Sequence, residues 1–165
     1  MNCNAPLSKA PEPIELLAPA RNLETGIEAL RHGADAVYIG GPAFGARSAA
    51  GNSVDDIRQL CAYAHIFGAR VYVTINTVLY DEEISQVERL VRDLYDAGVD
   101  ALITQDLAFL TMEIPPIALH ASTQMDNCTP DRARFLEVAG YSQIVMAREL
   151  SLSDPRNPRR NVFAP

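Results

Sequence analysis

The strongest constraint on the fold is a pattern that occurs four times: an apolar-periodic helix, a glycine, a short link and a run of apolar residues. The glycines are Gly33, Gly68, Gly98 and Gly140. A glycine directly after a helix supplies a left-handed cap, and a nearly continuous apolar run is typical of a strand covered on both faces. The glycines are about 30 to 42 residues apart, which is the size of one strand–helix unit.

Two further runs complete a series of six strands. Residues Ile14–Ala18 open the series, and Ile117–Ala121 lie between the third and fourth repeats. Alternating strands and helices leave two architectures, a doubly wound parallel sheet and a TIM-type barrel. No GxGxxG motif follows the first strand, and near-equal repeats favour the barrel. Because a complete barrel needs eight strands in about 250 residues, the sequence predicts parallel (βα) repeats in an incomplete α/β barrel of about six strands.

Residues ahead of the predicted helices mark where the helices begin. Asn52 or Ser53 can cap the helix that starts VDDIRQL, and Asp81 can cap the helix that starts EEISQVE. In the latter helix, apolar residues at helical spacing predict one buried face: Ile84, Val87, Leu90, Val91 and Leu94.

The predicted barrel portion occupies residues 14–152, between two segments of different character. Residues 1–13 lack the apolar core of a signal peptide and are interpreted as a disordered extension. Residues 153–165 are rich in proline and arginine and are interpreted as an irregular tail. A truncation or frameshift is an alternative explanation of this tail, and a basic arm that contacts RNA is another.

Composition narrows the classes of partner. A net charge of −7 gives no overall attraction for nucleic acid, so an RNA-binding surface would have to be local. The three cysteines form no CxxC or CxxH pair, so we predict neither a metal site nor a disulfide framework, and we expect a reducing cytoplasm. Since no apolar run is long enough to span a bilayer, no membrane partner is predicted.

Polar or permissive residues end nearly every predicted strand, and parallel α/β folds bind ligands at the carboxyl ends of their strands. The candidate substrate-binding residues are Gly40, Gly41, Arg47, Asn76, Gln105, Ser122 and Arg148, and the candidate catalytic residues are His120, Gln124 and Glu149. Free backbone amides at Gly40–Gly41 and the guanidinium of Arg47 suit an anionic group. The imidazole of His120 suits a ligand contact or a proton carrier near neutral pH.

Each candidate also has a structural alternative. His120 could be a core imidazole that donates to a carbonyl group. Turn or helix capping is the alternative for several polar residues: Asn76, Gln105, Asp106 and Ser122. Arg148 and Glu149 could form structural ion pairs. Tyr38 and Tyr72 are expected to pack between strands and helices.

The sequence shows no conventional peptidase machinery. It contains neither a GxSxG elbow nor an HExxH motif. Cys128 follows His120 by a few residues, but no residue that would orient a base is in view. Ser122 and Cys128 are therefore the only nucleophiles that we would test.

Six segments occur in order at consistent spacing: ELLAPARN, GADAVYIGGPAFGAR, VYVTINT, DLYDAGVDALITQD, HASTQ and ARELSL. Together they resemble the N-terminal region of the collagenase-like U32 peptidase family over residues 14–152. The resemblance is greatest to the branch that makes 5-hydroxycytidine in bacterial large-subunit ribosomal RNA. Other relatives hydroxylate tRNA uridine or quinone precursors without oxygen.

This resemblance implies an RNA-base hydroxylation factor, with ribosomal RNA or tRNA as partner and prephenate as hydroxyl donor. A peptidase or collagenase-like hydrolase is the alternative, and a non-catalytic partial barrel acting in binding or assembly is the second. Self-association through open sheet edges is expected in the last case.

The resemblance also implies an iron–sulfur cluster held by cysteines in a full-length family member. The family's cluster cysteines lie beyond the sixth strand, and Cys3, Cys61 and Cys128 do not match them. No cofactor is therefore predicted within this chain, and whether the chain alone is an enzyme stays open.

Overall fold

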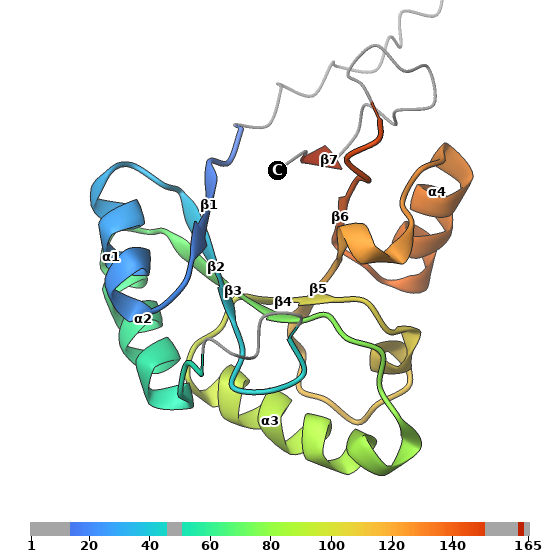
Figure 1. Cartoon of the computed structure of the whole chain (residues 1–165), viewed down its shortest axis with the longest axis horizontal. Coiled ribbons are helices and arrows are strands. Elements are labelled where there is room, and N and C mark those ends of the chain that lie inside the picture. The colour runs from blue at the N-terminus through green and yellow to red at the C-terminus, as the bar shows by residue number, and fades with distance from the viewer. Residues whose placement is uncertain (1–13, 46–50, 151–161, 164–165) are drawn as a thin grey trace, which may run out of the picture.

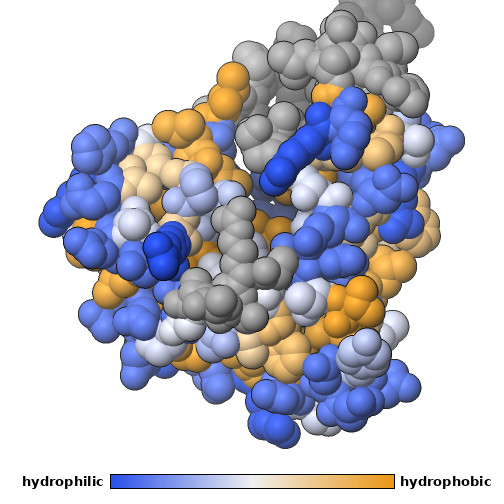
Figure 2. Space-filling model, viewed as in Figure 1, coloured by the Kyte–Doolittle hydropathy of each residue, from blue (hydrophilic) through white to orange (hydrophobic). Residues whose placement is uncertain are grey.

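The computed structural model describes residues 14–45, 51–150 and 162–163. A parallel sheet curls into an open half-barrel, and the helices lie outside the curve (Figure 1). Figure 2 shows mostly hydrophilic side chains along the left and lower margins of the molecule, over the helices, as expected for helix faces that are turned to solvent. None of the helices in the described ranges is long and apolar enough to cross a bilayer.

All strands are short and run parallel. Their bounds are Leu17–Ala20 (β1), Ala36–Gly40 (β2), Arg70–Ile75 (β3), Ala101–Thr104 (β4), Ala118–Ala121 (β5), Gln143–Val145 (β6) and Val162–Phe163 (β7). They are hydrogen-bonded in chain order from β1 to β7. A linear order in a curled sheet, with β1 at one edge and β7 at the other, confirms the predicted incomplete barrel.

The two ends of the sheet differ from the sequence prediction. β1 begins at Leu17 rather than Ile14, because its pairing with β2 starts at Leu17, and Ile14 and Leu16 are 87% and 58% exposed. At the other end, Val162–Phe163 lie in the segment predicted to be irregular, yet they pair with β6. Valine and phenylalanine both have high strand propensity, which accounts for the pairing.

In the described residues, four α-helices and three short 3₁₀ helices connect the strands. They are Leu23–Arg31 (α1), Val54–Ile66 (α2), Asp81–Glu83 (η2), Ile84–Asp96 (α3), Leu107–Leu110 (η3), Thr123–Met125 (η4) and Pro130–Ala139 (α4). The four repeat glycines that follow the α-helices all have positive φ, between 69° and 115°. This confirms the left-handed caps that define the repeat.

The helix starts follow local hydrogen bonding. Ser53, rather than Asn52, caps α2: its Oγ accepts from the amide of Asp56 at 3.1 Å, and Asp56 accepts in return from the Ser53 amide at 3.0 Å. Asp81 does not cap α3 as predicted, because it begins the 3₁₀ turn η2 that precedes this helix. The predicted apolar face of α3 is confirmed by its fully buried residues, which are Val87, Val91 and Leu94.

Apolar side chains pack on both sides of the sheet. The larger cluster fills the space between strands and helices and includes Val71 and Val73 of β3. A smaller cluster on the concave side contains Tyr72 and Ile103, with Tyr38 packed against it. Tyr38 and Tyr72 therefore do not pack between strands and helices as predicted. Successive side chains of a strand point to opposite faces, and Val71 and Val73 already occupy the helix side.

A polar group lies at the amino-terminal end of the concave face. The Tyr72 hydroxyl donates to Glu15 Oε2 at 2.8 Å, and Arg70 pairs with the same carboxylate at 3.2 Å. The side chain of Glu15 is only 15% exposed, so these two contacts stabilise its charge. These contacts place a paired charge at the amino-terminal end of the concave face, opposite the carboxyl ends where parallel α/β folds bind ligands.

Candidate functional site

Side chains on the concave face form rows across the half-barrel. The strand registers place Gly40 of β2 beside Thr74 of β3, Thr74 beside Ile103 of β4, and Ile103 beside His120 of β5. We call this the His120 row. Asn76 and Gln105 follow β3 and β4 directly, at the carboxyl end of the sheet. The structure thus brings His120, Asn76 and Gln105 to adjacent strand ends.

His120 is the ionisable residue of this row, and it is buried. Its residue is 6% exposed, and its ring stands edge-on to Tyr72 with 4.7 Å between the ring centroids. Within residues 14–45 and 51–150 the imidazole makes no hydrogen bond, so the expected core contact with a carbonyl is not formed there. Burial, with a smaller contribution from the charge of Arg70, lowers the pKa of His120 to about 4. The imidazole is therefore neutral near pH 7 and presents one hydrogen-bond donor and one acceptor there.

This lowered pKa predicts an acid-sensitive fold. Between about pH 4 and its ordinary pKa of 6.5, unfolded His120 binds a proton that the folded chain does not. The free energy of unfolding should therefore rise with pH across this window, by about 3 kcal/mol from His120, and be level above it. Urea unfolding of the native chain and of His120→Gln at about pH 4 and about pH 7 measures this contribution. Equal pH dependence of the two proteins would contradict it.

Two buried asparagines join neighbouring strand ends. Asn52 is 3% exposed, and its Nδ2 donates to the carbonyls of Arg21 and Gly40, both at 3.1 Å, which joins the ends of β1 and β2. Asn127 is fully buried, and its Nδ2 donates to the carbonyls of Ser122 and Val145, both at 2.8 Å. This second pair joins the end of β5 to β6.

Neither asparagine is among the candidate substrate-binding or catalytic residues named from the sequence. The available signal was position: Asn52 directly precedes the N-cap of α2, and Asn127 precedes Thr129, the N-cap of α4, by two residues. An asparagine next to a helix start that another residue already caps can use its side-chain amide to bond backbone carbonyls elsewhere.

Two predicted polar residues act as caps. Asp106 Oδ1 accepts from Ala108, which confirms the capping alternative, and its Oδ2 accepts from the amide of Leu79 at 3.0 Å, which links the loops after β3 and β4. Ser122 is 4% exposed, and its Oγ accepts from the amide of Gln124 at the start of η4. Its capping alternative is therefore confirmed as well.

The glycine pair at the end of β2, Gly40 and Gly41, does not present two free amides. Gly40 is paired with β3 in the sheet, and the amide of Gly41 donates to the carbonyl of Thr74 at 3.3 Å. The loop then lies close to the end of β3: a Cβ on Gly45 would come within 3.2 Å of the same carbonyl. The expectation of free amides at Gly41 is thus corrected, because close packing on β3 uses that donor. Arg47 lies outside the described residues.

The remaining candidates lie at the exposed edge of the site. Gln124 is exposed in η4, and Arg148 and Glu149 are exposed in the turn after β6. Neither Arg148 nor Glu149 forms an ion pair in the part of the chain that the structure describes. The structural ion pairs considered for them are not seen among those residues.

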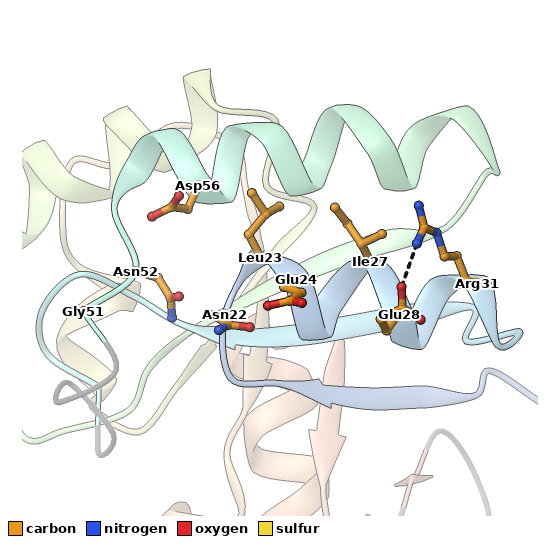
Figure 3. Close-up of a pocket in the computed structure, with 9 residues that line it drawn as sticks. All are labelled: Asn22, Leu23, Glu24, Ile27, Glu28, Arg31, Gly51, Asn52 and Asp56. Atoms are coloured by element: carbon orange, nitrogen blue, oxygen red, sulfur yellow. Dashed lines mark hydrogen bonds and ion pairs between the residues drawn. The ribbon is translucent and has the colours of Figure 1, made fainter.

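A groove of about 580 Å³ lies between α1 and α2 on the outer side of the sheet (Figure 3). It is lined by Asn22, Leu23, Glu24, Ile27, Glu28, Arg31, Gly51, Asn52 and Asp56. Glu28 pairs with Arg31 at 2.7 Å, and Asp56 is used in the α2 cap. Because three of its four charged side chains (Glu28, Arg31 and Asp56) are used locally and the strand ends converge elsewhere, we place the candidate site at the His120 row.

The cysteines in the described residues do not fit an iron–sulfur cluster. Burial raises the pKa of the Cys61 thiol to about 12, so it does not supply a thiolate. No group of three or more His, Cys, Asp or Glu residues within the described ranges could hold a metal ion. A cluster in a longer family member therefore stays a prediction, and no chemical step is derived through it.

A comparison with protein-family models identifies the family of this chain. The model of peptidase family U32 matches residues 21–162, most of the chain. The chain belongs to peptidase family U32.

Its relatives within the U32 family carry two kinds of name. The 23S rRNA 5-hydroxycytidine C2501 synthase of Escherichia coli is 55% identical over 87% of this chain and 22% of its own length. The tRNA hydroxylation protein P1 of Bacillus subtilis is 35% identical, with 90% of this chain and 36% of its own length covered. The collagenase of Porphyromonas gingivalis is 32% identical, with 86% and 35% covered. The U32 chain thus spans 22% to 36% of the length of these three relatives.

Solved structures agree on the fold. The U32 peptidase Mk0906 superimposes with a TM-score of 0.63 at 13% identity, over 85% of this chain and 61% of its own. Phosphonopyruvate hydrolase superimposes with a TM-score of 0.55 at 15% identity, over 81% and 54%. At such low identity these similarities establish the barrel-like fold of the U32 chain and nothing about its substrate.

Proposed function

We propose that this U32 chain is the N-terminal, substrate-recognising portion of a factor that forms 5-hydroxycytidine in ribosomal RNA. The observation that carries the proposal is its 55% identity to the E. coli 5-hydroxycytidine synthase, against 31% to 35% for four of the matched tRNA hydroxylation proteins. The collagenase is 32% identical. We expect such a factor to work in the cytoplasm, where its RNA is.

The side chains of His120 and of the adjoining Asn76 and Gln105 suit a neutral ligand. The side chains of His120, Asn76 and Gln105 carry no charge near pH 7 and can each donate and accept hydrogen bonds. The edge of an unstacked RNA base presents a complementary set of donors and acceptors. In this proposal these residues orient the cytidine, while Gln124 and Glu149 contact it from the exposed edge.

The hydroxyl donor needs a different environment. Prephenate, the donor that the family resemblance implies, carries carboxylates, and a guanidinium is the side chain that binds a carboxylate in two parallel hydrogen bonds. Arg148 is the predicted substrate-binding residue that can do this within the described ranges, and it is exposed after β6. We therefore assign Arg148, on the β6 side, as one contact of the donor, and the centre of the row as the place of the base.

A peptidase is the second candidate function, because the chain is also 32% identical to a collagenase. Its two conceivable nucleophiles are poorly suited. Ser122 is 4% exposed and caps η4, and the thiol of Cys128 donates to Asp126 Oδ1 at 3.0 Å. These contacts favour RNA hydroxylation over hydrolysis.

The proposal can be tested with a chimera. Residues 14–150 of this chain would replace the matching segment of the E. coli synthase, in an E. coli strain that lacks the native enzyme. We expect 5-hydroxycytidine to return to the 23S rRNA, as measured by mass spectrometry of its nucleosides. If a chimera that accumulates to the level of the native enzyme leaves the rRNA without 5-hydroxycytidine, the proposal is wrong.

A further inference from the structure

We propose that Arg21 is an anion-binding residue of this site, and that it contacts an oxyanion of the substrate at the β1 end of the His120 row. The oxyanion is a phosphate of the RNA or a carboxylate of the hydroxyl donor. The inference rests on the proposed function and adds a charged contact to it. Arg21 directly follows β1 and is not among the candidate substrate-binding or catalytic residues named from the sequence.

The backbone of Arg21 is held next to Gly40. The buried side chain of Asn52 donates to both carbonyls at 3.1 Å, so the end of β1 lies level with the end of β2. Gly40 begins the His120 row through its register with Thr74. Since Gly40 has no side chain, the position next to Arg21 leaves room on the concave face.

Alternation along β1, continued by one residue past the end of the strand, directs the Arg21 side chain to that face. Ala18 and Ala20 pack in the cluster between strands and helices, whereas Leu17 packs in the concave cluster. Two-residue alternation then assigns Pro19 to the concave side, and the same alternation, continued by one residue into the bend after β1, assigns Arg21 to that side. Arg21 is also absent from the lining of the acidic groove between α1 and α2, on the outer side of the sheet.

The position of Arg21 is fixed, and its charge is not used within the described residues. Its amide donates to Thr25 Oγ1 at 2.9 Å and its carbonyl accepts from Asn52, so both backbone groups are bonded. Its side chain is exposed and makes no ion pair or hydrogen bond in those ranges. In contrast, four other arginines contact carboxylates: Arg31, Arg58, Arg70 and Arg92.

This difference indicates a ligand. The chain has 21 acidic and 14 basic residues, so local acidic partners are plentiful. An arginine on a fixed backbone at the carboxyl end of a strand, without such a partner, can offer its planar donors to a phosphate or carboxylate. Arg89 and Arg134 are unpaired as well in the described ranges, but they lie on the outer helices α3 and α4.

The test compares Arg21→Gln with Arg89→Gln in the full chain. One probe is a short, fluorescein-labelled single-stranded RNA at low ionic strength, followed by anisotropy. The other is succinate, a dicarboxylate, followed by NMR shifts of the arginine side-chain N–H groups. We expect Arg21→Gln to weaken the binding of at least one probe by about 3- to 10-fold. If the ligand is a phosphate, the slope of log affinity for RNA against log salt concentration should also fall in magnitude by about one. Arg89→Gln should bind both probes like the native chain.

The outcomes separate the sources of the anion. A loss with RNA alone identifies a phosphate, and a loss with succinate alone identifies a carboxylate. Equal behaviour of the two variants with both probes, or no binding of either probe by the native chain, would overturn the proposal. Because these are binding measurements on the chain itself, they can succeed or fail independently of hydroxylation by the chimera.

Discussion

Replacing His120 by phenylalanine in the chimera is expected to lower the initial rate of 5-hydroxycytidine formation by about 100-fold. Phenylalanine keeps an aromatic ring against Tyr72, whose centroid lies 4.7 Å from that of the imidazole, but it removes both ring nitrogens. The loss should therefore come from the missing hydrogen bonds to the base. The rate is measured by mass spectrometry of nucleosides at short times after induction of the chimera.

Two controls separate this effect from unfolding. His120→Gln keeps a donor and an acceptor, so it should lose only about tenfold, a loss between those of the native and phenylalanine proteins. The phenylalanine chimera should also accumulate to the level of the unmodified one. Native rates for His120→Phe in a folded chimera would show that the imidazole does not contact the substrate.

Replacing Asn127 by aspartate is expected to lower the free energy of unfolding of the chain by about 3–5 kcal/mol near neutral pH. The native Nδ2 donates to two carbonyls at 2.8 Å from a fully buried position. An aspartate of the same shape would place a carboxylate oxygen against those two acceptors, with no solvent to stabilise its charge. Urea unfolding followed by circular dichroism gives the free energy.

Matched variants test the cause of this loss. Asn127→Ala removes the donors without adding a charge, so its loss should be smaller, about 2–3 kcal/mol. Gln86→Ala changes an exposed side chain on α3 and should stay within about 0.5 kcal/mol of the native chain. If Asn127→Asp lowered the free energy of unfolding no more than Gln86→Ala does, the two hydrogen bonds from Asn127 to carbonyls would not hold β5 to β6.

The repeat could be read from the sequence because its signals are local. A glycine such as Gly98, which has a φ of 92°, ends a helix by its own backbone preference. The apolar spacing of α3 likewise fixes which of its faces is buried. The strand start at Leu17 could not be read in this way, since Ile14 and Leu16 are as apolar as the strand itself. Pairing with β2, not composition, decides where β1 begins.

The site was predictable in position but not in detail. Strand ends locate His120, Asn76 and Gln105, because all carboxyl ends of a parallel sheet meet at one side. The neutral state of His120 depends on burial among residues distant in sequence, including Tyr72. The donors of Asn52 likewise reach carbonyls up to 31 residues away. Such contacts exist only after the sheet curls.

The central claim is that the strand ends, and not the groove between α1 and α2, carry the function. The most direct test compares two double variants of the chimera by the 5-hydroxycytidine content of 23S rRNA. One is Gln105→Ala with His120→Gln at the strand ends, and the other is Glu24→Gln with Glu28→Gln in the groove. The account predicts that the first loses most of the modified nucleoside and that the second keeps it. Full modification by the first variant, with loss in the second, would contradict the account.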